Sequence, residues 1–299
     1  MGSLATIGAG IALTLGASFV VGSLLIARRE PVPAAAAPSE PHTSWVETRS
    51  GRVSVLDLGS GDVVLLVHGS GRSLADWEEG FAEELARTFR VVAFDNYGFG
   101  RSDRNHGWEY GISLWARQAV DLLDALGIER AVILGHSSGA AVAAIVSAEH
   151  PERIRGAVLV GHGLAVDPAQ IVPAIPGIGE LWASQIAENG ETYSPMHRTR
   201  LEESYRIRGT RSALLMFIRR QFTIDGLRLI GGTYEKIRVP VLQAHGTKDA
   251  SIPIKAARSL SRRIPNVRFV EMETGHSIHA EQPVELADEV RRFVEGLDR

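Results

Sequence analysis

The most chemically suggestive segment of the sequence is Gly135-His136-Ser137-Ser138-Gly139, which follows the apolar run 131–134 and precedes an alanine-rich stretch. A strand that turns sharply into a helix at a G-x-S-x-G pattern lifts the central serine out of the sheet, and the flanking glycines leave room for the turn. The register selects Ser137, because the residue two positions before Ser138 is a histidine. An ordinary strand–helix turn is the alternative, and the strand and helix context favours a nucleophilic serine.

A second glycine-rich segment, His68-Gly69-Ser70-Gly71, follows the apolar run 63–67. Acyl transfer to a serine needs two backbone N–H donors directed at the developing oxyanion. One donor is expected from the residue after the nucleophile, Ser138, and the other from the loop after an earlier strand. We predict that Ser70 supplies the second amide, with Gly71 as the next choice.

The serine also needs a base, and the base needs an orienting carboxylate. Asp249 follows the expected strand segment 239–246, and His276 follows the expected strand segment 267–272. The order Ser, Asp, His along the chain is the one expected for a nucleophile elbow on an open α/β sheet. Asp167 is the alternative acid. His279 is the alternative base, although it falls where the next helix should begin.

Other histidines call for a simpler interpretation. The pair His276-x-x-His279 invites a zinc site, but the sequence shows no third ligand at metal spacing, so we expect no metal and no cofactor. Four more histidines, expected to be hydrogen-bonded scaffold or pocket lining, lie at strand ends: His68, His136, His162 and His245.

The elements that position these residues alternate along the chain, as in a mostly parallel sheet covered by helices on both faces. The expected strands are 53–58, 63–67, 91–94, 131–134, 157–160, 239–244 and 267–271. The expected helices are 74–87, 113–126, 139–149, 254–264 and 284–297. The core is therefore expected at 45–163 and 237–299.

The interval 164–236 contains no convincing strand and is too long for a structureless loop, so we predict a helical cap over the sheet. His136, Trp182 and Phe217 are the candidate substrate-binding residues. The cap also carries a group of arginines, for which a solvated, ion-paired helix face is the simplest interpretation and anion binding the alternative: Arg198, Arg200, Arg206, Arg208 and Arg211.

The N-terminal segment is uncharged from Leu4 to Ala27 and would reach about 36 Å as a helix, enough for a bilayer core of about 30 Å. Residues 1–30 are therefore expected to form a membrane anchor, followed by a Pro/Ala-rich tether at 31–44. Arg28 and Arg29 favour a catalytic domain on the cytoplasmic side. A signal sequence, cleaved near 34–37 to leave an exported protein, is the alternative.

Composition excludes several function classes. The chain has 299 residues and no cysteine, which rules out disulfides, thiolate metal sites and a cysteine nucleophile. The net charge of -3 gives no indication of a nucleic-acid partner.

Together these motifs resemble the α/β-hydrolase superfamily, and the turn Asp95-Asn96-Tyr97-Gly98-Phe99-Gly100-Arg101-Ser102 is similar to a further family pattern. The resemblance implies an eight-stranded, mostly parallel sheet with one antiparallel edge strand, a helical lid and a Ser137–His276–Asp249 triad. A serine at the elbow is unlike the dehalogenases and soluble epoxide hydrolases of this superfamily, whose nucleophile is a carboxylate.

The resemblance implies two-step acyl transfer, with a small-molecule or lipid-like carboxylic ester as the expected substrate. Carbon–carbon bond hydrolysis of a diketone, cofactor-free perhydrolysis and acyl transfer to an alcohol are alternatives on the same site. A non-catalytic, membrane-tethered binding protein is the alternative of another class, because fold does not imply function.

Overall fold

The structure is a computed structural model that describes residues 2–33, 43–78, 80–164, 171–185 and 194–297. Its centre is an eight-stranded sheet with the strand order β1-β2-β4-β3-β5-β6-β7-β8. The strands are β1 (Thr43–Thr48), β2 (Gly51–Leu58), β3 (Val63–Val67), β4 (Arg90–Phe94), β5 (Ala131–His136), β6 (Ile154–Val160), β7 (Val241–Gly246) and β8 (Val267–Met272). All seven expected strands are present within a few residues of their expected bounds.

The eighth strand, β1, begins inside the expected tether and pairs antiparallel with β2, which in turn pairs antiparallel with β4. The remaining neighbours are parallel. The expectation of an antiparallel edge strand is therefore wrong in one detail, because β2 is the reversed strand and β1 covers its outer side. β1 alternates between half-buried and exposed positions, a weaker hydrophobic signal than that of the central strands.

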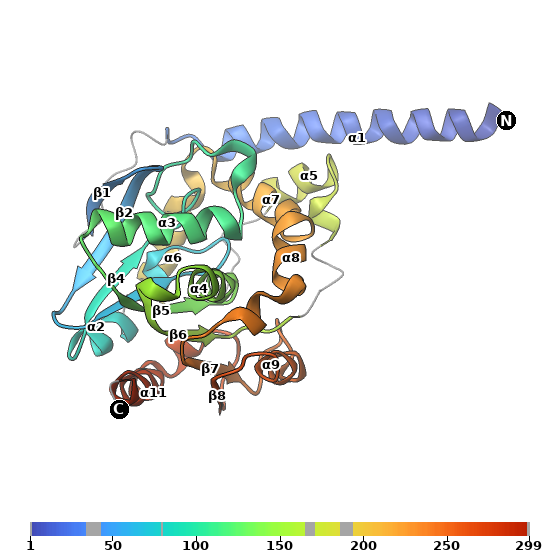
Figure 1. Ribbon diagram of the computed structural model, residues 1–299. Coiled ribbons are helices and arrows are strands. Elements are labelled where there is room, and N and C mark those ends of the chain that lie inside the picture. Colours follow the sequence, from blue (N-terminus) through green and yellow to red (C-terminus); the bar gives the residue numbers. More distant parts are fainter. Residues whose placement is uncertain (1, 34–42, 79, 165–170, 186–193, 298–299) are drawn as a thin grey trace.

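Helices cover both faces of the sheet (Figure 1). Along β3, Val64 and Leu66 join one apolar cluster while Leu65 and Val67 join the other, as the two-residue period of a strand requires. The core helices are α2 (Phe81–Ala86), α3 (Ile112–Ala125), α4 (Ser138–Glu149), α9 (Ile254–Ser261), α10 (Ile278–Glu281) and α11 (Pro283–Gly296). α3 and α4 contribute to the cluster on one face, and α2 and α11 to the cluster on the other.

One expected helix, 74–87, is instead a 3₁₀ turn, η2 (Leu74–Asp76), followed by α2. Gly80 separates them with a φ of 140°, a conformation that a continuous helix cannot hold. Asp76, at the end of η2, is 2% exposed and lies near His136 and His279.

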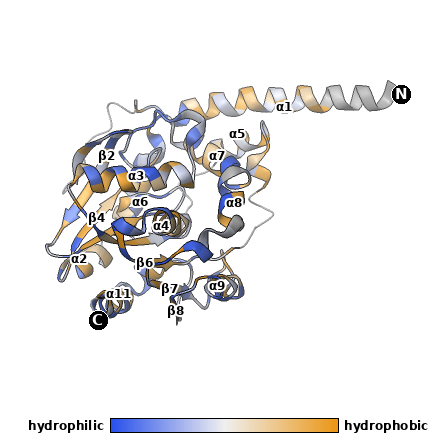
Figure 2. Cartoon of the chain, viewed as in Figure 1, coloured by the Kyte–Doolittle hydropathy of each residue, from blue (hydrophilic) through white to orange (hydrophobic). Residues whose placement is uncertain are grey.

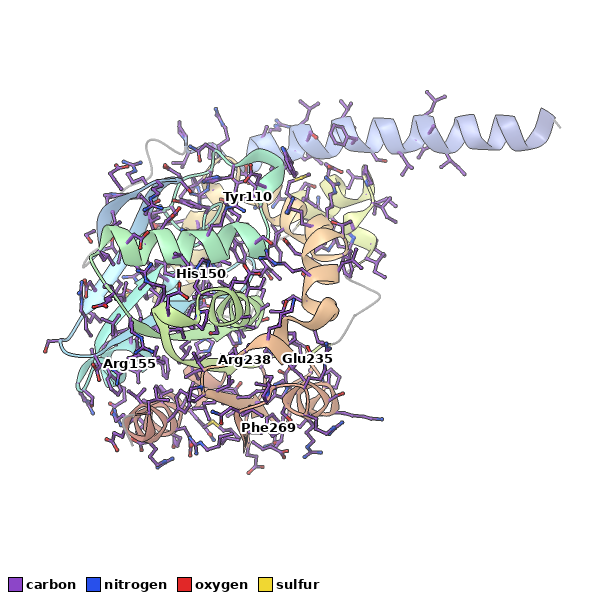
Figure 3. All side chains as sticks on the ribbon, in the orientation of Figure 1. Tyr110, His150, Arg155, Glu235, Arg238 and Phe269 are labelled. Carbon is purple, nitrogen blue, oxygen red and sulfur yellow. The ribbon has the colours of Figure 1, made fainter. Side chains whose placement is uncertain are left out.

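Between β6 and β7 the chain forms helices above the sheet, as expected for the cap. They are η6 (Val172–Ala174), α5 (Ile178–Gln185), α6 (Pro195–Arg206), α7 (Thr210–Gln221), α8 (Ile224–Arg228), the π-turn η7 (Leu229–Thr233) and η8 (Tyr234–Lys236). Figure 3 labels Glu235 and Arg238, where the chain returns to β7 and the Arg238 guanidinium donates to the Glu235 carbonyl at 2.8 Å.

The N-terminal helix α1 (Gly2–Arg29) extends beyond the rest of the molecule and passes along α5 (Figure 1). One helix in the described chain, over Ile11–Arg29, is long and apolar enough to cross a membrane, and only 11% of its apolar window is buried. Figure 2 shows hydrophobic colours over much of the part of α1 that it colours.

Candidate active site

The nucleophile elbow has the geometry that the sequence pattern predicts. Ser137 is the one residue other than glycine with a positive φ in the described chain, at φ 54° and ψ -118°. Such a conformation costs about 1–3 kcal/mol and persists only where its surroundings enforce it. Here the Ser137 amide donates to the Val160 carbonyl of β6 at 2.9 Å, which ties the turn to the neighbouring strand.

The two glycines of the pattern are required by close backbone approach. A Cβ at Gly135 would lie 2.1 Å from the Gly139 carbonyl oxygen, and a Cβ at Gly139 would lie 2.1 Å from the Val67 carbonyl oxygen. Both contacts are with backbone, which cannot move aside without distorting the sheet. The elbow therefore accepts only glycine at either position.

The predicted acid and the predicted base meet on the loops after β7 and β8. His276 Nδ1 lies 2.8 Å from Asp249 Oδ2, and Asp249 Oδ1 accepts hydrogen bonds from the amides of Ser251 and Ile252, each at 2.8 Å. Burial alone would raise the pKa of Asp249, but the bonds from His276 and the Ile252 amide lower it below its usual value. Asp249 is thus an ionised carboxylate that holds the imidazole of His276 through its Nδ1 atom.

Ser137, His136 and His276 line one cavity of about 450 Å³ at the carboxyl ends of the strands, together with Ser70 and Ser138. Of the alternatives, His279 lies one layer deeper, where it is 1% exposed and packs against Trp77 with ring centroids 4.8 Å apart. Asp167, the alternative acid, lies outside the described residues.

The two predicted oxyanion donors belong to residues that are in contact at the start of α4. Ser138 is the first residue of α4, where the leading amides have no partner within the helix. The Ser70 amide donates to Ser138 Oγ at 2.7 Å, so the two predicted donors are next to one another. Gly71 has a φ of 73°, and its carbonyl accepts from the Tyr205 hydroxyl of the cap at 3.1 Å.

Two predicted substrate-binding residues lie elsewhere. Phe217 is 1% exposed and stacks on Trp115, with ring centroids 4.5 Å apart, in the core between the cap and α3. Trp182 packs beside the small cluster of Ile26, Ala183 and Leu215. Neither is part of the described cavity wall, because helical periodicity does not distinguish a residue that faces a cavity from one that faces another helix.

Other cavity residues come from the cap, the neighbouring loops, α3 and α4, and no sequence pattern singled them out. The apolar ones are Ile112, Ala141, Leu164, Phe222, Leu229 and Ile252, and the polar ones include Arg72 and Gln221. His162, expected as scaffold or pocket lining, also lines the cavity. Phe222 and Leu229 lie in the predicted cap interval, but nothing in their spacing singled them out.

His162 supports the elbow from behind. Its Nε2 lies 2.6 Å from the Tyr234 hydroxyl of the cap, and its ring also hydrogen-bonds to the Ser137 backbone. Burial lowers its pKa to about 4, with like-charge repulsion from His245 and His276 acting in the same direction. His68 and His245 are fully buried and bonded to backbone groups, as expected for scaffold.

A charge network lies beneath the elbow. Asp76, His136 and His279 each place one possible ligand atom within 4.8 Å of the others, and this group does not include His276 of the predicted His276-x-x-His279 pair. Asp76 already accepts from Arg72 Nε at 3.0 Å with both oxygens and lies 2.9 Å from His197 Nε2. Because the Arg72 guanidinium compensates the charge of the carboxylate, a metal ion would have to compete with Arg72 for it.

Comparison with known proteins agrees with this geometry. A sequence model of the α/β hydrolase fold matches residues 62–194. A 2-hydroxy-6-oxo-2,4-heptadienoate hydrolase of Pseudomonas putida is 30% identical over 238 residues, covering 76% of this chain and 86% of the relative. The chain belongs to the α/β-hydrolase family. A 2-hydroxymuconate semialdehyde hydrolase of a Pseudomonas species is 29% identical over 259 residues, covering 83% of this α/β hydrolase and 92% of the relative.

The fold likeness extends over the N-terminal helix as well. The crystal structure of a membrane phospholipase A superposes with a TM-score of 0.64 at 22% identity and covers 99% of this chain and 98% of that one. At this identity the likeness concerns the fold of the α/β hydrolase and not its substrate.

Proposed function

We propose that the protein is a serine hydrolase that cleaves carboxylic esters through a Ser137–His276–Asp249 triad. The observation that carries the proposal is the strained elbow, which presents Ser137 to the same cavity as an imidazole already oriented by an ionised Asp249. A strained conformation kept in a cavity, with both neighbouring glycines forced by backbone contacts, favours a reactive role over a structural one.

In this mechanism His276 takes the proton of Ser137 as the serine oxygen attacks the carbonyl carbon. The oxyanion accepts hydrogen bonds from the Ser138 amide and from either the Ser70 amide or the Ser138 hydroxyl to which that amide donates. The alcohol then leaves with a proton from His276. Water then attacks the acyl-enzyme with His276 again as base, and the acid is released. Asp249 keeps the imidazole in the tautomer that can accept at Nε2.

The cavity favours a small or medium substrate with an apolar part and an anionic group. Its wall combines apolar side chains with Arg72, and the described lining contains no carboxylate side chain. Arg72 is held from behind by the buried Asp76, which leaves the guanidinium little conformational freedom to lose when a substrate binds.

Hydrolysis of a carbon–carbon bond next to a carbonyl is the second candidate. Two relatives with 29–30% identity are hydrolases of 2-hydroxymuconate semialdehyde and 2-hydroxy-6-oxo-2,4-heptadienoate. Such a substrate carries a carboxylate that suits Arg72. The same acyl-enzyme would form, with the leaving carbon taking the proton from His276.

We further propose that α1 anchors the enzyme in a membrane, with the catalytic domain on the cytoplasmic side. The apolar span and the two arginines at its end support this arrangement. Recovery of a mature protein beginning near residues 34–37 would indicate export after signal cleavage instead.

A direct comparison of substrates tests the two candidates. Full-length enzyme in detergent is assayed against p-nitrophenyl esters of increasing chain length and against a 2-hydroxy-6-oxo-dienoate, with Ser137→Ala as the blank. The proposal expects the larger kcat/KM for an ester. A dienoate turned over much faster than any ester would replace it with the second candidate, and no turnover of either would favour a binding protein.

A further inference from the structure

The N-terminal helix is attached to the cap along one stripe of its surface. Leu15, Ser18, Gly22 and Ile26 recur at helical spacing and are partly or fully buried, whereas the positions between them are mostly exposed. A Cβ at Gly22 would lie 2.6 Å from the Glu180 backbone of α5, so the two helices touch backbone to backbone. At Gly177 the cap backbone likewise abuts the Leu15 carbonyl.

The end of α1 is fixed to the cap by polar contacts. Glu30 is 1% exposed, and its carboxylate accepts from the amides of Gly209 at 2.7 Å and Arg211 at 2.6 Å. Two residues further, Val32 forms a parallel bridge with Ile207, and Arg208 donates its amide to the Val32 carbonyl at 2.8 Å. The start of the expected tether is therefore part of the cap, and α1 cannot swing away from α5 without breaking these bonds.

This attachment limits the length of helix that is free to cross a bilayer. The part of α1 before Leu15 rises only about 20 Å, which is shorter than a hydrocarbon core of about 30 Å. Figure 1 shows that this end projects past the other elements, while the later part runs beside α5. A membrane-spanning α1 would therefore bring the adjoining edge of the cap into the bilayer with it.

The edge of the cap beside α1 has an exposed apolar surface, which insertion into a bilayer would require. Its exposed large side chains are Ile171, Val172, Ile175 and Ile178, each 38–47% exposed. The only ionisable side chain between residues 171 and 185 is Glu180, which is 4% exposed and paired with Arg219 at 2.9 Å. α5 packs against α1, on which Phe19, Val20 and Val21 are also about half exposed.

Charge is arranged to match a lipid surface. Arg28 and Arg29 end α1 and are exposed, and Arg206 and Arg208 are exposed beside the bridge that follows α1. A group of exposed guanidiniums next to an apolar surface complements anionic headgroups next to acyl chains.

We propose that the cap edge formed by residues 171–178 is immersed in the lipid bilayer beside α1, so that the enzyme is held by two apolar elements rather than by one helix. The apolar side chains of this edge contact acyl chains, and the arginines at the end of α1 contact the headgroups. The proposal concerns the lipid surface only and is independent of which bond the active site cleaves.

The absence of cysteine makes a single-label experiment direct. Full-length Ile175→Cys, carrying an environment-sensitive fluorophore, is reconstituted into vesicles of phosphatidylcholine and phosphatidylglycerol. We expect its emission to shift to shorter wavelength and to be quenched by lipids spin-labelled on the acyl chain. Phe19→Cys reports the anchor in the same way, and Lys255→Cys, exposed on α9, should stay in water and be quenched by iodide.

Three other outcomes would contradict the immersed cap edge. A label at 175 that iodide quenches, with the label at 19 quenched by lipid, would overturn the immersed cap edge while leaving the anchor. Both labels in water would overturn the anchor and the cap edge together. A label at 175 shielded from iodide and lipid alike, in a concentration-dependent manner, would show that a second copy covers the patch.

Discussion

The Ser70 amide donates its hydrogen bond to the hydroxyl oxygen of Ser138 at 2.7 Å, so one predicted oxyanion donor is occupied by the side chain of the residue that supplies the other. Because that hydroxyl accepts from Ser70, its own proton is available to another acceptor. Ser138 lines the cavity, where the oxyanion would form. Substrate binding must therefore either take the Ser70 amide from Ser138 or use the hydroxyl as an intermediary.

Ser138→Ala separates these routes. We expect kcat to change less than about tenfold, because both backbone donors survive and the Ser70 amide is released to the oxyanion, whereas loss of a true donor costs about 10²–10³. Steady-state kinetics on the preferred ester measure the effect. A loss of that larger size, in a variant that unfolds at the wild-type temperature, would show that the hydroxyl itself binds the oxyanion.

Gly139→Ala should destabilise the protein by several kcal/mol, because the new Cβ would lie 2.1 Å from the Val67 carbonyl oxygen and neither backbone segment can yield. Gly296→Ala at the end of α11 is the matched control, since a Cβ there meets nothing within 4 Å. Denaturant midpoints compare the two. Similar midpoints would mean that the elbow is less tightly packed than this geometry indicates.

The acid limb of the pH dependence of kcat/KM should not come from the buried histidines that surround the predicted triad. Burial lowers the pKa of His162 to about 4 and that of His279 to about 3, and lowers the pKa of His136 well below its usual value. His162 and His279 are therefore neutral above about pH 5, and the lowered pKa of His136 favours its neutral form as well. His279→Gln should leave the midpoint of the limb unchanged, and a displaced midpoint would place His279 in the proton-transfer chain.

Asp76 should make stability sensitive to acid. Burial would raise its pKa, but Arg72 and the His197 hydrogen bond lower the pKa far below its usual value. A depressed carboxyl pKa stabilises the fold above the unfolded value of about 4, and the contribution is lost as the pH falls below it.

Asp76→Asn should therefore lose about 3–5 kcal/mol at pH 7, because it leaves Arg72 without its buried partner. The gap to wild type should narrow toward pH 3. Asp57→Asn, which removes a half-exposed partner of Arg90, should cost at most about 1 kcal/mol. Equal losses in the two variants at pH 7 would contradict the role given to the buried network.

The central strands β3 and β5 were predictable because they are almost entirely buried and read as nearly unbroken apolar runs. β1 was not predictable, because an edge strand with a solvent-exposed face contains few consecutive apolar residues. Its first residues also adjoin a proline-rich stretch. Asp249 and His276 could be found because each stands alone on a loop directly after a strong strand. The expected Asp249–His276 pairing is present at 2.8 Å.

The network of Arg72, Asp76, His136, His197 and His279 was beyond sequence reasoning, because its members come from separate loops and helices brought together only by the fold. Phe217 and Trp182, predicted to bind substrate, lie outside the described cavity lining. A cap packs apolar side chains against the core, against α1 and toward the cavity with the same periodicity, so composition could not say which surface each one faces.

Covalent labelling of the nucleophile tests the central claim most directly. Full-length wild-type protein in detergent is treated with a fluorophosphonate, and the adduct is located by peptide mass spectrometry. We predict one adduct, on Ser137, no adduct in Ser137→Ala, and labelling of Asp249→Asn slowed by orders of magnitude, because the imidazole loses its orienting carboxylate. An adduct on another serine, or an unlabelled wild-type enzyme, would contradict the account.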